Sequence, residues 1–185
     1  MNESQPILID IPQNTPEWLA WRKTVIGASD TPMIMGLSTH GDMLDVFIAK
    51  VYGKENENSF ILQKGHEIEE KVRAQYQITS IGDFPSICKQ RDFLGASADG
   101  WNEEIKKGLE IKYTGKDNMG DEIPEKFFCQ CQQQMWVFDV NEWILLRSND
   151  GIVVKENVIL RDKRYFGKVL TKLRKFWERV QEYKN

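Results

Sequence analysis

The pattern of apolar and polar residues starts with helical spacing. Thr15 suits a helix N-cap and Pro16 suits the first turn, where the missing N–H of proline costs nothing. A short helix is therefore predicted that begins at about Pro16, contains Trp18 and Arg22, and stops before Gly27. Ser29-Asp30 is expected to cap a second helix that stops near Gly36.

Two longer helical patterns follow. Residues 42–51 are apolar at helical spacing and are followed by Gly53, which favours a helix end. Residues 60–77 predict a longer helix with one apolar stripe. The residues near this stripe are Ile61, Leu62, Gly65, Ile68, Glu69, Val72 and Tyr76.

The character changes to short strands over residues 81–112, where Gly and Pro break the chain into a meander. A helix is predicted from Pro124 to about Phe138. Two strands over 143–147 and 152–160 then precede a last amphipathic helix. This order predicts an α/β fold of α+β-like character, with one mixed central sheet flanked by helices.

Length and charge narrow the function classes. The 185 residues suit a single domain over 1–185, and no membrane-spanning run or signal segment is visible, so we expect a cytoplasmic protein. The three cysteines do not suit a disulfide framework or a zinc site. The formal charge of -3 argues against a general nucleic-acid binder.

Charge is unevenly distributed along the chain. Residues 161–185 hold nine Lys/Arg against three Asp/Glu, a net +6, which leaves -9 on the first 160 residues. The basic side of the last helix is either a solvated face or a contact for phosphates or for an acidic neighbour.

Candidate chemistry lies in the strand meander. Asp99-Gly100 forms a turn signal, and Glu110-Ile111-Lys112 follows on the next strand. Because side chains two apart in a strand share a face, Glu110 and Lys112 should point the same way. Two carboxylates suit Mg²⁺, and a lysine beside them suits phosphodiester hydrolysis. Taken alone, this strand is better explained as an amphipathic strand with a surface ion pair.

Five motifs in a fixed order change this assessment. They read Arg22 with Ile26-Gly27-Ala28-Ser29, Gly65-His66-Glu67-Ile68-Glu69, Ser97-Ala98-Asp99-Gly100, Glu110-Ile111-Lys112 and Gln130-Cys131-Gln132-Gln133-Gln134-Met135-Trp136. Together they resemble the lambda exonuclease and YqaJ-like viral recombinase family of PD-(D/E)xK nucleases, although Ala98 stands where that family usually has Pro. The resemblance implies a restriction-endonuclease-like core.

The resemblance also implies roles for individual residues. Asp99, Glu110, Glu69 and the backbone carbonyl of Ile111 are expected to hold the metal, Lys112 to serve the attacking water, and Gln130 to lie beside them. Arg22, Ser29 and Ser97 are expected to bind the 5'-phosphate of DNA, in a way that suits a guanidinium and a helix N-terminus. The alternative for Arg22 is an ion pair with Glu17 or Asp30 on the helix surface, and Ser29 taken alone is better explained as a plain N-cap. Gln132 and Trp101 are weaker candidates, Trp101 for a DNA contact.

The function that the resemblance implies is a 5'-to-3' exonuclease on double-stranded DNA ends. It would use Mg²⁺, with Mn²⁺ as a substitute, work beside a single-strand annealing protein and form a homo-oligomer, in this family often a ring-shaped trimer. Alternatives are an inactive DNA-end-binding or assembly module and a structure-specific endonuclease of the same fold. A related nuclease with an iron–sulfur cluster is disfavoured, because it needs four cysteines.

Overall fold

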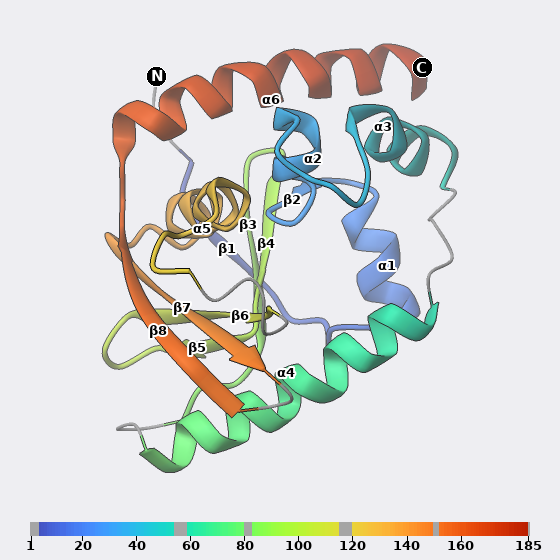
Figure 1. Ribbon diagram of the computed structural model, residues 1–185. Coiled ribbons are helices and arrows are strands. Elements are labelled where there is room, and N and C mark those ends of the chain that lie inside the picture. The colour runs from blue at the N-terminus through green and yellow to red at the C-terminus, as the bar shows by residue number, and fades with distance from the viewer. Residues whose placement is uncertain (1–3, 54–58, 80–82, 115–119, 150–151, 185) are drawn as a thin grey trace.

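A computed structural model describes residues 4–53, 59–79, 83–114, 120–149 and 152–184 (Figure 1). In chain order the elements are β1 (Ile7–Ile9), α1 (Pro16–Arg22), β2 (Ile26–Gly27), α2 (Thr31–Met35), α3 (Met43–Tyr52), α4 (Ser59–Thr79), β3 (Ile87–Arg91), β4 (Leu94–Ala98), β5 (Gly100–Asn102), β6 (Lys107–Tyr113), α5 (Glu125–Phe138), β7 (Glu142–Asn149), β8 (Ile152–Leu160) and α6 (Lys163–Lys184).

The strands form two four-stranded sheets, which corrects the expectation of one central sheet. The first sheet has the order β1-β3-β4-β2 and the second the order β5-β6-β7-β8. Both are mixed, because β2 runs parallel to β4 and β6 runs parallel to β7. The chain passes from one sheet to the other at Asp99. Before this residue β4 pairs with β3, and after it β5 pairs with β6. One backbone hydrogen bond, from the Asp99 N–H to the Leu109 carbonyl (3.1 Å), ties the two sheets at this point.

The helices cover the sheets in layers. Figure 1 shows α5 between the strands and α6, while α4 crosses the second sheet on its opposite side. Alternate residues of β7 serve the two faces: Trp143 and Leu145 join the core under α5, and Ile144 and Leu146 join the core under α4. This division follows from the two-residue period of a strand. Strand β7 of the second sheet is therefore buried on both faces.

The helix predictions hold in most details. The Thr15 side chain caps α1 by accepting from the Trp18 N–H (3.2 Å), and Gly36 and Gly53 end α2 and α3 in the left-handed conformation. The apolar side of α6 is buried as expected, and its basic side is exposed. The chain between β7 and β8 includes residues 150–151, which lie outside the described residues, as do the side chains of α4 before Glu67.

Two expectations need correction. Asp30 occupies the N-cap position of α2, but its side chain makes no capping hydrogen bond, because it is engaged in buried ion pairs. The strands β1 and β2 were not expected. Among the described residues, no helix combines the length and the apolar character that crossing a bilayer requires.

Candidate active site

The two sheets bring Asp99 and Glu110 to the same cleft. Asp99 lies where the chain changes sheets, and its Oδ2 accepts a hydrogen bond from the Ile111 N–H (2.7 Å). This bond fixes the Asp99 carboxylate against β6, one residue from Glu110. Glu110 and Lys112 share a face of β6, as the strand period predicts, and the Lys112 Nζ lies 2.5 Å from the Glu110 Oε1.

Glu110 is 2% exposed, and helix α5 satisfies its carboxylate. The Gln130 Nε2 donates to Oε1 (2.6 Å), and the Gln134 amide donates to Oε2. Gln130 and Gln134 lie four residues apart and so share one face of α5. A carboxylate oxygen has two acceptor positions, so Glu110 keeps capacity for a cation.

Negative charge is concentrated around Asp99. Burial raises the pKa of the Asp99 carboxyl, and the neighbouring charges of Glu110 and Glu69 raise it further, well above its ordinary value. Burial acts to lower the pKa of Lys112, but the same carboxylates outweigh it and raise the pKa above its ordinary value. Such a group of carboxylates is stabilised by a cation.

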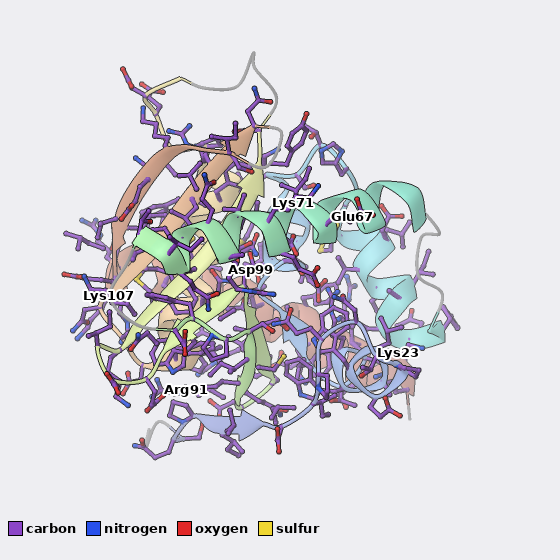
Figure 2. The ribbon with its side chains drawn as sticks, turned by 90° about the horizontal axis from the view of Figure 1, so that it is seen from below. Lys23, Glu67, Lys71, Arg91, Asp99 and Lys107 are labelled. Atoms are coloured by element: carbon purple, nitrogen blue, oxygen red, sulfur yellow. The ribbon has the colours of Figure 1, made fainter. Side chains whose placement is uncertain are left out.

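Glu69 comes to this site from α4. Figure 2 shows Asp99 next to α4, where the helix crosses the sheet. Glu69 and Asp99 line two adjoining cavities, one of about 230 Å³ and one of about 460 Å³. The Arg73 guanidinium, one helical turn beyond Glu69, donates to the main-chain carbonyl of Asp99 (2.9 Å) and so holds this part of α4 against the sheet junction.

The donor set fits a hard divalent cation bound by few protein ligands. Within the described ranges, no group of three or more His, Cys, Asp or Glu side chains forms a complete metal cage. Asp99 and Glu110 nevertheless line one cleft, and the Asp99 Oδ1 has no hydrogen-bond partner among the described residues. Mg²⁺ is usually held by one or two carboxylates together with water and substrate phosphates.

The same cleft of about 230 Å³ contains the three predicted phosphate-binding residues, Arg22, Ser29 and Ser97. The Arg22 NH2 donates to the Ser29 Oγ (3.0 Å) and to the Asp30 Oδ1 (3.1 Å). The Arg22 guanidinium also lies over the Trp18 ring, 4.8 Å from its centroid. Of the two ion pairs considered for Arg22, the structure forms the one with Asp30, and Arg22 still faces the cleft.

Close packing of α1 on β4 positions this pocket. The Trp18 Nε1 donates to the Ser97 Oγ (3.0 Å), which connects the helix of Arg22 to the strand that leads to Asp99. Gly95 permits the approach, because a Cβ there would lie 2.7 Å from the Val25 Cγ2 and 2.9 Å from the Trp21 Cζ2. The pocket and the carboxylates are therefore attached to one packed unit.

Comparison with known proteins identifies the family. Residues 17–141 match the YqaJ-like viral recombinase domain, which is more than half of the chain. The chain belongs to this family. No curated protein sequence matches the chain significantly.

Solved structures support the fold of this YqaJ-like domain. An alkaline exonuclease from Laribacter hongkongensis superposes with a TM-score of 0.67 at 22% identity, covering 91% of this chain and 93% of the other. The same enzyme in complex with dAMP gives 0.68 with the same identity and coverage. A phage-related exonuclease from Haemophilus somnus 129PT gives 0.60 at 14% identity, covering 86% and 93%. The chain has the restriction-endonuclease-like fold of these relatives.

Two of the weaker site candidates lie away from the cleft of this YqaJ-like domain. Gln132 is buried, donates to the Leu160 carbonyl (2.8 Å) and accepts from the Asp162 N–H (2.7 Å), so it anchors the start of α6. Trp101 is 2% exposed and packs against Trp143, so it offers no surface to DNA. Both expectations are corrected.

Several residues of this domain's site were missed by the sequence analysis. Gln134 and Arg73 each lie one helical turn beyond a recognised site residue, Gln130 and Glu69, and this spacing could have indicated them. Lys50, in α3, has no such signal, although its buried ammonium lies 2.7 Å from the Asp30 Oδ2.

Proposed function

We propose that this protein is a metal-dependent 5'-to-3' exonuclease that acts on double-stranded DNA ends. The observation that carries the proposal is that two sets of side chains, one acidic and one able to donate to a phosphate, line one cleft. Asp99, Glu110 and Lys112 line the same cavity as Arg22, Ser29 and Ser97. A cleft with carboxylates for a cation and donors for a phosphate suits phosphodiester hydrolysis next to a phosphorylated end. Membership of a viral recombinase family supports the choice of DNA as substrate.

Asp99, Glu110 and the Ile111 carbonyl would hold Mg²⁺, or Mn²⁺ in its place, with Glu69 as a further carboxylate. When bound, the cation lowers the pKa of water and offsets charge on the phosphate. The hydrogen bond from the Ile111 N–H fixes the Asp99 carboxylate before any ligand arrives (2.7 Å). The Gln130 amide does the same for Glu110 (2.6 Å).

Lys112 is the residue that we propose to act on the attacking water. The Lys112 side chain is 24% exposed, and its Nζ is held by the buried Glu110, so it can donate a hydrogen bond into the cleft from a fixed position. The water oxygen attacks phosphorus and the bond from phosphorus to the 3'-oxygen breaks. The leaving 3'-oxygen takes up a proton, and the attacking water loses one to solvent.

The products explain the use of the phosphate pocket. Cleavage at this bond releases a 5'-mononucleotide and leaves a new 5'-phosphate on the shortened strand. Arg22 can bind that phosphate with two parallel N–H donors, and Ser29 can add its hydroxyl. Each round therefore regenerates the group that the pocket binds, which is the basis for proposing the 5'-to-3' direction.

A homo-oligomer, in the form of a ring-shaped trimer, and a single-strand annealing partner complete the proposal. A ring would allow a chain of net charge -3 to hold DNA with selected Lys and Arg side chains around a channel. We expect the mass of the purified protein, measured by light scattering, to be three times that of one chain. A monomeric mass at micromolar concentration would contradict the ring.

The activity is tested on DNA substrates that differ in their ends. Linear duplex with 5'-phosphate and covalently closed circular duplex are incubated with Mg²⁺, Mn²⁺ or EDTA, and released mononucleotides are measured. Wild-type protein should degrade only the linear duplex, and only with a divalent cation. Lys112→Ala should lose at least about a hundredfold in rate, the usual scale for a group that assists proton transfer.

Lys107→Ala is the matched control, because Lys107 lies on the same strand β6. Its side chain is 40% exposed and forms an ion pair with Glu142. It should retain the wild-type rate. Binding of ends without release of nucleotides under either cation would identify an inactive end-binding module. Cutting of the circular duplex would identify an endonuclease, and either result would overturn the proposed exonuclease.

A further inference from the structure

A buried ionic network lies behind the phosphate pocket. Asp30 is 7% exposed as a side chain, and its Oδ1 faces the Arg22 NH2 (3.1 Å). Its Oδ2 lies 2.7 Å from the Lys50 Nζ and accepts the Gly27 N–H (2.8 Å). Asp30 is thus shared between one cation that faces the cleft and one that does not.

Lys50 is as deeply buried as Asp30, with 5% of its side chain exposed. Besides Asp30, it contacts the main-chain carbonyl of Arg22, to which its Nζ donates (2.7 Å). Lys50 lines a second cavity on the other side of Arg22 and does not line the cleft that holds the carboxylates. Lys50 is therefore placed to affect a phosphate in the cleft through its charge and through its contacts with Asp30 and Arg22, and not by lining the cleft.

The charge balance of this group gives Lys50 a consequence for binding. Arg22, Lys50 and Asp30 together carry a net +1. Without Lys50, Asp30 would neutralise Arg22 and the group would present no net charge to a phosphate. Because charges interact strongly in such a poorly solvated place, the difference of one charge should be felt in the cleft. The pKa of the Asp30 carboxyl lies below its ordinary value, because Lys50 and Arg22 outweigh the effect of burial.

We infer that Lys50 is a positioning residue for the 5'-phosphate. It engages the Asp30 carboxylate, so that the Arg22 guanidinium is held in place by Asp30 without being neutralised by it. This inference rests on the proposed phosphate pocket, but not on cleavage of DNA. A purely structural role for Lys50 would change stability and would alter binding of all DNA ends equally.

The test compares binding of two duplexes that are identical except for a 5'-phosphate or a 5'-hydroxyl. Both carry a fluorophore on the 3' end, and the dissociation constants are measured by anisotropy in EDTA. Wild-type protein should prefer the 5'-phosphorylated duplex. Lys50→Met should reduce that preference by roughly tenfold, the scale of losing one nearby charge that is partly screened by solvent.

The control and the rescue variant separate charge from structure. The control is Lys23→Met, because Lys23 lines the same second cavity as Lys50 but makes no ion pair with Asp30 in the described structure. The preference of this variant for the 5'-phosphorylated duplex should stay unchanged. The double variant Asp30→Asn with Lys50→Met restores the net +1 and should return the preference to within about threefold of wild type. It does not restore the hydrogen bond to the Arg22 carbonyl, so recovery would be electrostatic.

The outcomes decide the inference in each case. A Lys50→Met protein with the wild-type preference overturns it, and so does wild-type protein that binds both duplexes equally. If Lys50→Met does not fold, as judged by circular dichroism, the double variant decides: loss of its preference overturns the inference. Wild-type protein that prefers the 5'-phosphate through Lys50 but releases no nucleotide with Mg²⁺ or Mn²⁺ overturns the exonuclease alone.

Discussion

Gln133 offers the sharpest test of how the fold supports the site. Its side chain is fully buried in α5, and its Nε2 donates to the carbonyls of Ile26 (2.8 Å) and Gly95 (3.0 Å). Its Oε1 accepts from the Thr31 hydroxyl. These bonds connect α5 with the parallel pair β2–β4 and with α2. Gln133→Leu keeps the approximate size and removes all three.

The magnitude follows from burial and bond count. Each hydrogen bond contributes about 1 kcal/mol net, and a buried polar group left without its partner costs about 1–3 kcal/mol. Leu adds some apolar burial, which offsets part of this loss. We therefore expect the free energy of unfolding to fall by about 3–5 kcal/mol. For a chain of this size that corresponds to roughly 6–20 °C in Tm.

Urea and thermal unfolding of the protein in EDTA measure this effect. Gln75→Leu is the control, because Gln75 is exposed on α4, and its change should stay within about 0.5 kcal/mol. A loss below about 1 kcal/mol for Gln133→Leu would refute the reasoning, since it would mean that α5 does not support the β2–β4 pair through this amide.

Three further predictions concern charge and burial. Asp99→Asn should raise the free energy of unfolding in EDTA by about 1 kcal/mol, and with it the Tm, because it removes a buried charge beside two other carboxylates. It should also abolish any gain in Tm from Mg²⁺ or Mn²⁺ in differential scanning fluorimetry, and a lower Tm in EDTA would contradict the prediction. Gln132→Leu should cost about 2 kcal/mol of stability in urea unfolding, while nucleotide release per folded molecule stays unchanged, because its two bonds hold the start of α6. The depressed pKa of Asp30 means that its ion pairs stabilise the fold above the ordinary carboxyl pKa and lose this effect on acidification; unfolding free energies measured between pH 5 and pH 3 should therefore fall more steeply for wild type than for Asp30→Asn, and parallel slopes would count against it.

Several helices and the strand β6 were predictable because their signals are local. The Thr-Pro start of α1 and the glycines after α2 and α3 act through the backbone of a single turn. The pairing of Glu110 with Lys112 needed only the two-residue period of β6. By contrast, β2 has two residues, Ile26 and Gly27, and two residues show no period.

The division into two sheets was not predictable from local pattern. At Asp99 the strand changes its partner from β3 to β6, and a strand's own residues do not record which neighbour it pairs with. The misplacement of Trp101 has a related cause. Trp101 pairs with Gly108, and the open space over that glycine is filled by Trp143, a residue more than thirty positions away in the sequence. A sequence window around Asp99 does not reach Trp143.

The glutamine run shows both the strength and the limit of a motif. Gln130 was recognised, but Gln132 was preferred over Gln133 and Gln134. In a helix, residue 134 returns to the face of residue 130, while residue 132 points away. The structure follows this geometry: Gln134 reaches Glu110 and Gln132 reaches the start of α6.

Through these hydrogen bonds, the helix α5 sets the position of the two sheets relative to each other. Gln133 donates a hydrogen bond to the first sheet, close to the cleft that contains Arg22. Gln130 and Gln134 donate to Glu110 in the second sheet. Changes in loop length elsewhere leave that spacing untouched. A single residue inserted between Gln130 and Gln133 would instead turn the side chains of Gln133 and Gln134 by roughly 100° about the helix axis relative to Gln130. The hydrogen bonds to the two sheets could then no longer form together. The spacing of these three amides along α5 is therefore set by the two sheets that they contact.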